Sequence, residues 1–437
     1  MSKSEPQSTA PVPERAILVG VNRGGGEWSC EESLMELERL AETDGVQTVM
    51  QVYQRLDTPV PKTYVGAGKA QEIATLTRNL DADVVIFDDE LTPSQQSNLE
   101  KIMGKGVKVI DRTALILDIF GDHAKTREGK LQVELAQNQY VLPRLRGMWS
   151  HLVREQTRGG IGSRFGQGES QLEVDRRLVR NRISQLRGEL KELDKRRNVQ
   201  SKARWDSGIY RVALVGYTNA GKSTLLNKLT GSGVYVRDEL FATLDPTTRM
   251  LDLEEGRKIT ITDTVGFIQK LPTLLVEAFK STLAEVVAAD LILLVVDASD
   301  NNASKEINAV KQVLTEIKAN EIPAVLVFNK CDLLSADERS ELIASYPDAE
   351  LISAQTGFGI RGLLYRVAKE ASAHDELITV RIPYAKGILM KMAHERCRVV
   401  REQYEQEGLL MTVMAPQRLI ATFRSYEAAD TSAQSDH

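Results

Sequence analysis

Residues 216–224 read "GYTNAGKST" and match the pattern G-x-x-x-x-G-K-[ST] at every fixed position. The stretch follows the apolar segment 211–215, which predicts a buried strand, and it overlaps the start of 224–230, whose leucine spacing predicts a helix. Glycines at such a junction allow backbone N–H groups to point at phosphate oxygens. We therefore predict a phosphate-binding loop, with Lys222 on the β- and γ-phosphates and Ser223 on Mg²⁺.

Three further motifs follow in order, each at the end of an apolar strand candidate. They are "DTVG" (263–266), "NKCD" (329–332) and "SAQTG" (353–357). Asp263 is expected to hold Mg²⁺ through water, and the Gly266 N–H is expected to sense a γ-phosphate. The Asp332 carboxylate can accept two hydrogen bonds from guanine, and adenine lacks that pair of donors. Together the motifs predict a GTPase domain with a mixed, mostly parallel sheet.

A threonine-rich stretch, "FATLDPTTR" (241–249), lies where a GTPase switch loop offers a threonine to Mg²⁺. Thr243, Thr247 and Thr248 are the candidates. We favour Thr243, because its distance along the chain from Ser223 best suits a short switch loop. The residues expected to contact GTP lie in the phosphate loop, the switch segments and the base-recognition motifs: Gly216, Tyr217, Thr218, Asn219, Ala220, Gly221, Lys222, Ser223, Phe241, Ala242, Thr243, Leu244, Asp245, Asp263, Thr264, Val265, Gly266, Asn329, Lys330, Cys331, Asp332, Ser353, Ala354 and Gln355.

Phe267 follows "DTVG", at the position where many GTPases place a glutamine that orients the attacking water. Phenylalanine cannot do this, so we assign no catalytic side chain. Two explanations stay open. Either hydrolysis is slow until a partner completes the site, or a monovalent cation supplies the missing charge. For the second we expect K⁺ beside the phosphates, held partly by Asn219.

A second glycine-rich stretch, "TRGGIGSRFGQGES" (157–170), lies between two long helical patterns. The first runs over 127–150. The second carries one apolar seam, interrupted by Arg176, and predicts an antiparallel helical hairpin with the glycines at its tip. The seam residues are Leu172, Val179, Ile183, Leu186, Leu190 and Leu193.

Charge is spread unevenly along the chain. Residues 144–204 carry 16 Lys/Arg and 7 Asp/Glu, a net +9, which leaves −14 on the remainder of a chain whose total is −5. A basic island in an acidic protein is typical of a surface that contacts an anionic partner. A solvated helix rich in both signs of charge is the alternative interpretation.

The composition excludes several classes of protein. Cys30, Cys331 and Cys397 lie far apart without metal-ligand spacing, which indicates reduced thiols and no structural zinc. The N-terminus lacks the apolar core of a signal peptide, and the longest strongly apolar run, 291–296, is too short to cross a bilayer. We expect a cytoplasmic monomer, with peripheral membrane association left open.

We predict an α/β protein with four folded parts between disordered ends. An N-terminal α/β domain precedes the hairpin, and a GTPase domain and a small α+β C-terminal module follow it. The expected ranges are 1–14 disordered, 15–126 α/β, 127–204 hairpin, 205–375 GTPase, 376–428 C-terminal module and 429–437 disordered. In the last module we expect a helix over 386–405 and strands at "LLMTVMAP" and "LIATFRSY".

Two features of the N-terminal part resemble sites without completing one. The GxGK within 65–73 lacks the phosphate-loop spacing, so we interpret it as a turn entering a helix and leave a second nucleotide open. The acidic cluster Asp88, Asp89 and Glu90 has no second acid or base near it in sequence, and we interpret it as a solvated turn.

Beyond the GTPase motifs, "DDELTPSQQSNLE" (88–100) and "GKLQVELAQNQYVLPRL" (129–145) resemble the N-terminal signature of the HflX family of Obg-like GTPases. The resemblance implies binding to the large (50S) ribosomal subunit and splitting of idle or stalled ribosomes under stress. For the C-terminal module we expect a ribosomal protein as the partner. A large-subunit assembly GTPase and a regulatory GTPase with a non-RNA partner are the alternatives.

The tip departs from the family pattern, which often reads GGIGTRGPGE, because Phe165 is inserted and Gln167 stands where proline is common. Its glycines leave little bulk, so its backbone can enter a narrow RNA cavity. The residues expected to contact rRNA are Arg158, Gly159, Gly160, Arg164 and Phe165.

Overall fold

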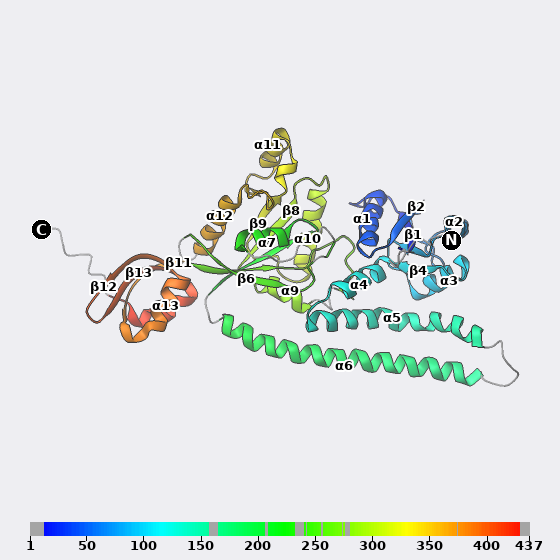
Figure 1. Ribbon diagram of the computed structural model, residues 1–437, viewed down its shortest axis with the longest axis horizontal. Helices are drawn as coiled ribbons and strands as arrows, with labels where there is room; N and C mark the ends of the chain where they lie inside the picture. Colours follow the sequence, from blue (N-terminus) through cyan, green and yellow to red (C-terminus); the bar gives the residue numbers. More distant parts are fainter. Residues whose placement is uncertain are drawn as a thin grey trace, which may run out of the picture. The chain divides into compact units, whose positions relative to one another are not determined.

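The computed structural model describes residues 13–156, 165–205, 209–231, 240–241, 243–254, 257–272, 274–275, 280–373 and 375–428 (Figure 1). The chain divides into two compact units. One comprises Met1–Leu190 with Gln269–Ala278, and the other comprises Lys191–Ile268 with Phe279–His437. A short segment that follows the "DTVG" motif therefore folds with the N-terminal unit.

The N-terminal unit contains the predicted α/β layer. Its four strands pair in parallel in the order β2-β1-β3-β4. Apolar side chains such as Ile17, Val19, Val85 and Phe87 form the core, as expected for a parallel sheet. The elements are β1 (Arg15–Asn22), α1 (Cys30–Thr43), β2 (Gln47–Arg55), α2 (Ala67–Asn79), β3 (Val84–Phe87), α3 (Pro93–Met103), β4 (Lys108–Asp111) and α4 (Arg112–His123).

Local sequence sets where these helices begin. The side chains of Ser29 and Thr92 accept from the backbone N–H of Glu32 and Gln95. The backbone N–H groups of the two caps donate in return to the side chains of Glu32 and Gln95, so both form capping boxes. The GxGK segment enters α2 with Gly66 at the N-cap, as the sequence predicted for a turn before a helix.

Two long helices, α5 (Arg127–Gln156) and α6 (Phe165–Trp205), form the hairpin arms (Figure 1). Ile183 and Leu186 of the predicted seam are buried. The Arg182 guanidinium donates to both oxygens of Glu134, at 2.6 and 2.7 Å, and so joins the two helices. Helix α5 continues through Pro143.

The tip lies mostly outside the described residues, which omit 157–164 with Arg158, Gly159, Gly160 and Arg164. Phe165 is the first residue of α6, so the helix begins earlier than the sequence suggested.

The GTPase sheet has the order β10-β9-β8-β5-β7-β6, in which only the β6–β7 pair is antiparallel. This confirms the predicted mixed, mostly parallel sheet. Its central strands are nearly continuous apolar runs, as burial on both faces requires. The elements are β5 (Tyr210–Gly216), α7 (Lys222–Thr230), β6 (Thr247–Asp252), β7 (Lys258–Asp263), α9 (Lys280–Val287), β8 (Leu291–Asp297), α10 (Ala303–Glu316), β9 (Ala324–Asn329), η1 (Cys331–Leu333), α11 (Ala336–Ser345), β10 (Glu350–Leu351) and α12 (Ile360–Ser372).

The C-terminal module is a three-stranded antiparallel sheet in the order β11-β13-β12, with helices packed against it. Cys397 and Phe423 lie in its core. The elements are β11 (Asp375–Pro383), η2 (Tyr384–Lys386), α13 (Gly387–Arg396), β12 (Arg398–Tyr404), β13 (Gly408–Pro416), α14 (Gln417–Phe423) and η3 (Arg424–Tyr426).

Two local predictions for this module were wrong. The helix expected over 386–405 ends at Arg396, and 398–404 form β12, because that segment pairs with β13 along its length. The segment expected as a strand at "LIATFRSY" forms α14 instead, with Leu419, Ile420 and Phe423 on one apolar face toward the sheet. Tertiary packing overrides weak local propensity at both places.

A buried ion pair joins the β6–β7 hairpin to the start of β11. Arg257 donates to Asp375 at 2.8 Å and to the Ala371 carbonyl at 2.7 Å. Both charged side chains are almost fully buried. Lys258, at the start of β7, pairs with Glu395 of α13 at 3.1 Å. The hairpin between the switch segments is thus anchored in the C-terminal module.

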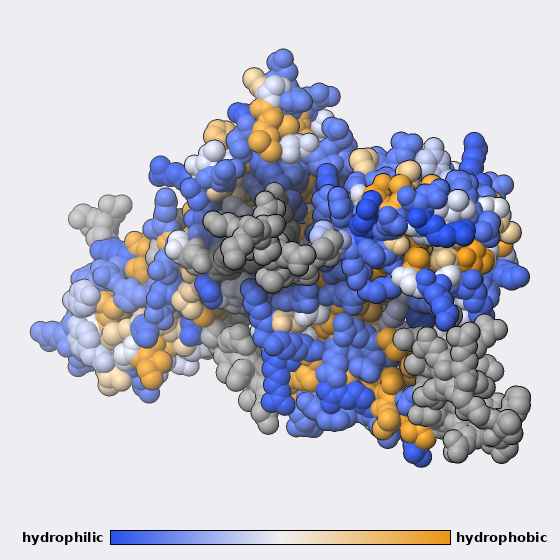
Figure 2. All heavy atoms as spheres, turned by 45° about the vertical axis from the view of Figure 1, so that its right-hand side comes forward, coloured by the Kyte–Doolittle hydropathy of each residue, from blue (hydrophilic) through white to orange (hydrophobic). Residues whose placement is uncertain are grey.

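Hydrophilic side chains cover most of the face seen in Figure 2, and hydrophobic ones form scattered groups. Within the described part of the chain, no helix combines the length and the apolar character needed to cross a bilayer.

Candidate guanine-nucleotide site

The phosphate loop turns between β5 and α7, and two of its glycines are sterically required. Gly221 has φ +89°, and a Cβ there would lie 2.2 Å from the Asn329 amide nitrogen. A Cβ on Gly216 would lie 2.0 Å from the Val295 carbonyl oxygen. The backbone of the loop therefore lies too close to β8 and to Asn329 for any residue with a Cβ at these two positions.

Lys222 is the first residue of α7 and is buried. Its Nζ donates to the carbonyl oxygens of Gly216 at 3.1 Å and Tyr217 at 2.7 Å, which holds the ammonium inside the loop. Burial lowers the pKa of Lys222 to about 8, against the opposing charges of Asp263 and Glu306. A phosphate at this loop would favour the charged form.

Ser223, Thr243 and Asp263 come together at the end of the loop. Ser223 Oγ lies 2.8 Å from Thr243 Oγ1 and donates to Asp263 Oδ2 at 2.6 Å. Asp263 Oδ1 is buried and has no hydrogen-bond partner. Burial raises the pKa of Asp263, although Lys222 and the two hydroxyl groups oppose that shift.

This cluster suits Mg²⁺, because it offers hard oxygen ligands and one unsatisfied carboxylate oxygen. Ser223 and Thr243 would hold the ion directly, and Asp263 would do so through water. Mg²⁺ neutralises charge on the β- and γ-phosphates when it is bound. The other threonine candidates, Thr247 and Thr248, lie in β6, where Thr248 Oγ1 is 2.9 Å from Thr262 Oγ1.

The base-recognition motifs are joined by the side chain of Asn329. Its amide donates to the Ala220 carbonyl at 2.9 Å and accepts from the Ala354 N–H at 2.9 Å. One residue thus fixes the phosphate loop, "NKCD" and "SAQTG" to one another. The Cys331 N–H donates to Ile352 O at 3.1 Å, and Ser353 is buried.

The groups expected to read guanine face solvent near this junction. Asp332, in η1, and Gln355 are exposed. Lys330 has φ +62°, and its Nζ pairs with Asp297 at 2.7 Å. Asp297 ends β8 beside β9, and we did not predict it. It could have been predicted from the sequence, because it lies at the carboxyl end of the strand that neighbours the one before "NKCD".

The switch segment after β7 lies against the phosphate loop. The Thr218 N–H donates to Phe267 O at 2.8 Å, and the Phe267 N–H donates to Gly216 O at 3.1 Å. A Cβ on Gly266 would lie 2.9 Å from Thr218 Cα and 3.1 Å from Lys222 Nζ. The Phe267 side chain is 2% exposed and therefore acts as a core residue.

Other residues predicted to contact GTP lie nearby, and some of them also contact the protein core. Thr264 Oγ1 donates to Leu214 O at 2.7 Å. Phe241, with φ +58°, and Leu244 are buried, and Ala242 lies outside the described residues. Asn219, in the phosphate loop, has φ +61°. The structure brings the phosphate-loop, switch and base motifs to one edge of the sheet.

Three family models match the chain in succession. They are described as the N-terminal part of a GTP-binding GTPase, its middle region and a 50S ribosome-binding GTPase, and they match residues 31–121, 123–204 and 211–330. The GTPase HflX of Caldanaerobacter subterraneus is 46% identical over 397 residues, which cover 91% of this chain and 90% of that protein.

The chain belongs to the HflX family of GTPases. The GTPase HflX of Escherichia coli (strain K12) is 45% identical over 381 residues, or 86% of this chain and 88% of that protein. That of Magnetococcus marinus is 42% identical over 414 residues, or 93% and 94%. This HflX-family chain is a GTPase that binds and hydrolyses GTP.

Proposed function

We propose that this GTPase binds the large ribosomal subunit and dissociates stalled or idle ribosomes under stress. The observation that carries the proposal is the basic helical hairpin. Between residues 177 and 195, helix α6 presents exposed positive side chains, which suit salt-dependent contacts with RNA phosphates. They include Arg177, Arg180, Arg187, Lys191 and Lys195.

The family description "50S ribosome-binding GTPase" for residues 211–330 supports the same partner. GTP would order the switch segments and raise the affinity of the protein for rRNA, and hydrolysis would release the protein. Such coupling requires different affinities in the two nucleotide states. The protein would act in the cytoplasm.

The tip of the hairpin is proposed to make the decisive rRNA contacts. We expect Arg158→Ala/Arg164→Ala to reduce the rate of 70S dissociation about 10-fold or more at physiological salt, because two phosphate contacts are lost. GTP affinity should stay at the wild-type value. Dissociation is measured by light scattering, and nucleotide affinity by fluorescence titration.

Lys101→Ala/Lys311→Ala serves as the control, because it removes two exposed positive charges outside the hairpin. Splitting at the wild-type rate by the arginine variant refutes the tip assignment. A preference of the wild-type protein for immature large subunits would instead indicate an assembly factor. Partner binding that is insensitive to salt would indicate a regulatory GTPase without RNA.

We also propose that Ser223, Thr243 and Asp263 hold Mg²⁺, and that K⁺ binds beside the phosphates with Asn219 among its ligands. Phe267 is buried, so a cation is one way to supply charge at the reaction centre. Hydrolysis should be faster in K⁺ than in Na⁺ buffer by about 10-fold, and Asn219→Ala should remove the difference. Equal rates in the two buffers for the wild-type protein contradict the K⁺ proposal.

A further inference from the structure

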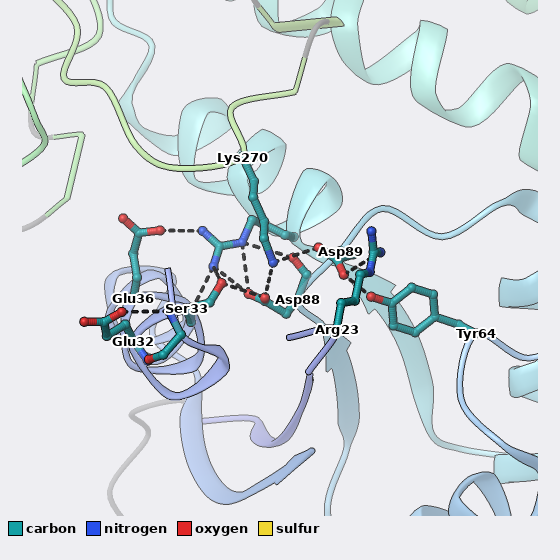
Figure 3. A network of polar contacts seen from close by, with 10 residues as sticks. Arg23, Glu32, Ser33, Glu36, Tyr64, Asp88, Asp89 and Lys270 are labelled. Atoms are coloured by element: carbon teal, nitrogen blue, oxygen red, sulfur yellow. Dashed lines mark hydrogen bonds and ion pairs between the residues drawn. The ribbon is translucent and has the colours of Figure 1, made fainter. Parts of the chain in front are cut away.

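An ion-pair network occupies the carboxyl end of the N-terminal sheet (Figure 3). Asp88 follows β3 and is 2% exposed, so the prediction of a solvated turn was wrong for this residue. It accepts from the Arg112 guanidinium at 2.6 Å and from Ser33 Oγ at 2.7 Å. Because these partners are distant in sequence, the burial of Asp88 could not be predicted from the residues around it.

The charges contributed by the N-terminal segments do not balance. Arg112 also pairs with Glu36 at 2.6 Å, and Arg23 pairs with Asp89 at 3.1 Å. These pairs bring together three carboxylates and two guanidinium groups, and Glu32, which Figure 3 also draws in the network, adds a fourth carboxylate. A carboxylate in such a buried place needs a compensating cation.

Lys270 supplies that cation. Its Nζ pairs with Asp88 and, at 2.7 Å, with Asp89 Oδ1. Figure 3 shows its side chain reaching from a separate segment to both carboxylates. Burial opposes ionisation of Asp88, but the charges of Arg112 and Lys270 outweigh it and lower the pKa of Asp88 to about 2.

Lys270 belongs to the segment that continues the GTPase switch. Gln269–Ala278 folds with the N-terminal unit, whereas Ile268 and the residues before it fold with the GTPase unit. Lys270 has φ +52°, a left-handed conformation that is unfavourable for lysine. Such a conformation persists where the surrounding contacts determine it, and the two ion pairs are those contacts.

The other end of this short connection is fixed on the phosphate loop. Phe267 exchanges backbone hydrogen bonds with Gly216 and Thr218. Only Ile268 and Gln269 separate Phe267 from Lys270, and three residue steps span at most about 10 Å. A short stretch of chain therefore links the switch loop to the ion pairs of Lys270.

We propose that Lys270 is a positioning residue of the GTPase switch, anchored on Asp88 and Asp89 of the N-terminal unit. Gly266 lies close to Lys222, so a γ-phosphate held by that lysine also meets the Gly266 N–H, and Thr243 lies 2.8 Å from Ser223 in the same arrangement. The ion pairs hold the chain that follows Gly266 and so favour GTP over GDP. By reciprocity, GTP strengthens the contact between Lys270 and the two aspartates.

Lys270→Ala tests this assignment in the full chain, without ribosomes. Affinities for GDP and a non-hydrolysable GTP analogue are measured by titration with fluorescent nucleotides. We expect the ratio of the GTP-analogue Kd to the GDP Kd to rise about 5- to 20-fold, which is usual for coupled sites. Lys270→Arg keeps the charge and should restore the wild-type ratio, which a purely structural role would not predict.

Lys69→Ala is the matched control, because Lys69 pairs with Glu72 at 2.9 Å within α2 and has no link to the switch. Asp89→Asn should raise the ratio as well, and adding it to Lys270→Ala should have little further effect. An unchanged ratio in Lys270→Ala protein with the wild-type Tm overturns the proposal, and so does an equal change in Lys69→Ala. If Lys270→Ala does not fold, Lys270→Gln is measured against the same two outcomes.

Discussion

Lys222→Ala will lower the single-turnover rate of GTP hydrolysis by about 10²–10³-fold, the usual cost of removing one preorganised hydrogen-bond donor. Lys222 is held inside the loop by the Gly216 and Tyr217 carbonyls, so its charge is in position before substrate arrives. Phosphate release from bound GTP is the measurement. Wild-type GTP affinity should also fall as the pH rises above about 8, because the free lysine then loses its proton.

Lys311→Ala, on α10, controls for the loss of one positive charge and should hydrolyse GTP at the wild-type rate. A Lys222→Ala protein that hydrolyses GTP within 3-fold (about 0.65 kcal/mol) of wild type would show that the loop lysine is not used in the reaction.

Arg257→Ala will destabilise the unit that contains the GTPase sheet and the C-terminal module by about 3–5 kcal/mol, because it leaves Asp375 buried without its partner. The loss also removes the hydrogen bond to Ala371 O, at the end of α12. The free energy of unfolding is measured by urea titration with fluorescence and circular dichroism. Arg257→Met/Asp375→Leu should recover most of the loss, since no charge then stays buried.

Arg361→Ala is the matched control. Its ion pair with Glu254, at 3.6 Å, joins two side chains that are 89% and 77% exposed. Such pairs contribute at most about 1 kcal/mol. Equal destabilisation by Arg257→Ala and Arg361→Ala would contradict a special role for the buried pair.

Most of the nucleotide site could be predicted because its residues follow strands of one parallel sheet. The carboxyl ends of such strands meet at one edge, so motifs distant in sequence converge there. Ser223, Asp263 and Asn329 illustrate this rule. Thr243 could be predicted beside Ser223 only from the length of the loop between them, which suits a short switch loop.

The parts that could not be predicted depend on partners that are remote in the chain. Asp88 looks like a surface acid until Arg112 and Lys270 are seen beside it. Residues 398–404 look helical until β13 is available to pair with them. Local pattern carries no information on either partner, because both contacts are created by tertiary structure.

The central claim is that the GTP-bound protein separates ribosomal subunits. The most direct test mixes the full chain with purified 70S ribosomes and follows light scattering with GTP, a non-hydrolysable analogue or GDP. We predict dissociation with GTP and with the analogue but not with GDP, and faster GTP hydrolysis when 50S subunits are added. Intact 70S particles in all three nucleotide states, with no stimulation of hydrolysis by 50S subunits, would contradict the account.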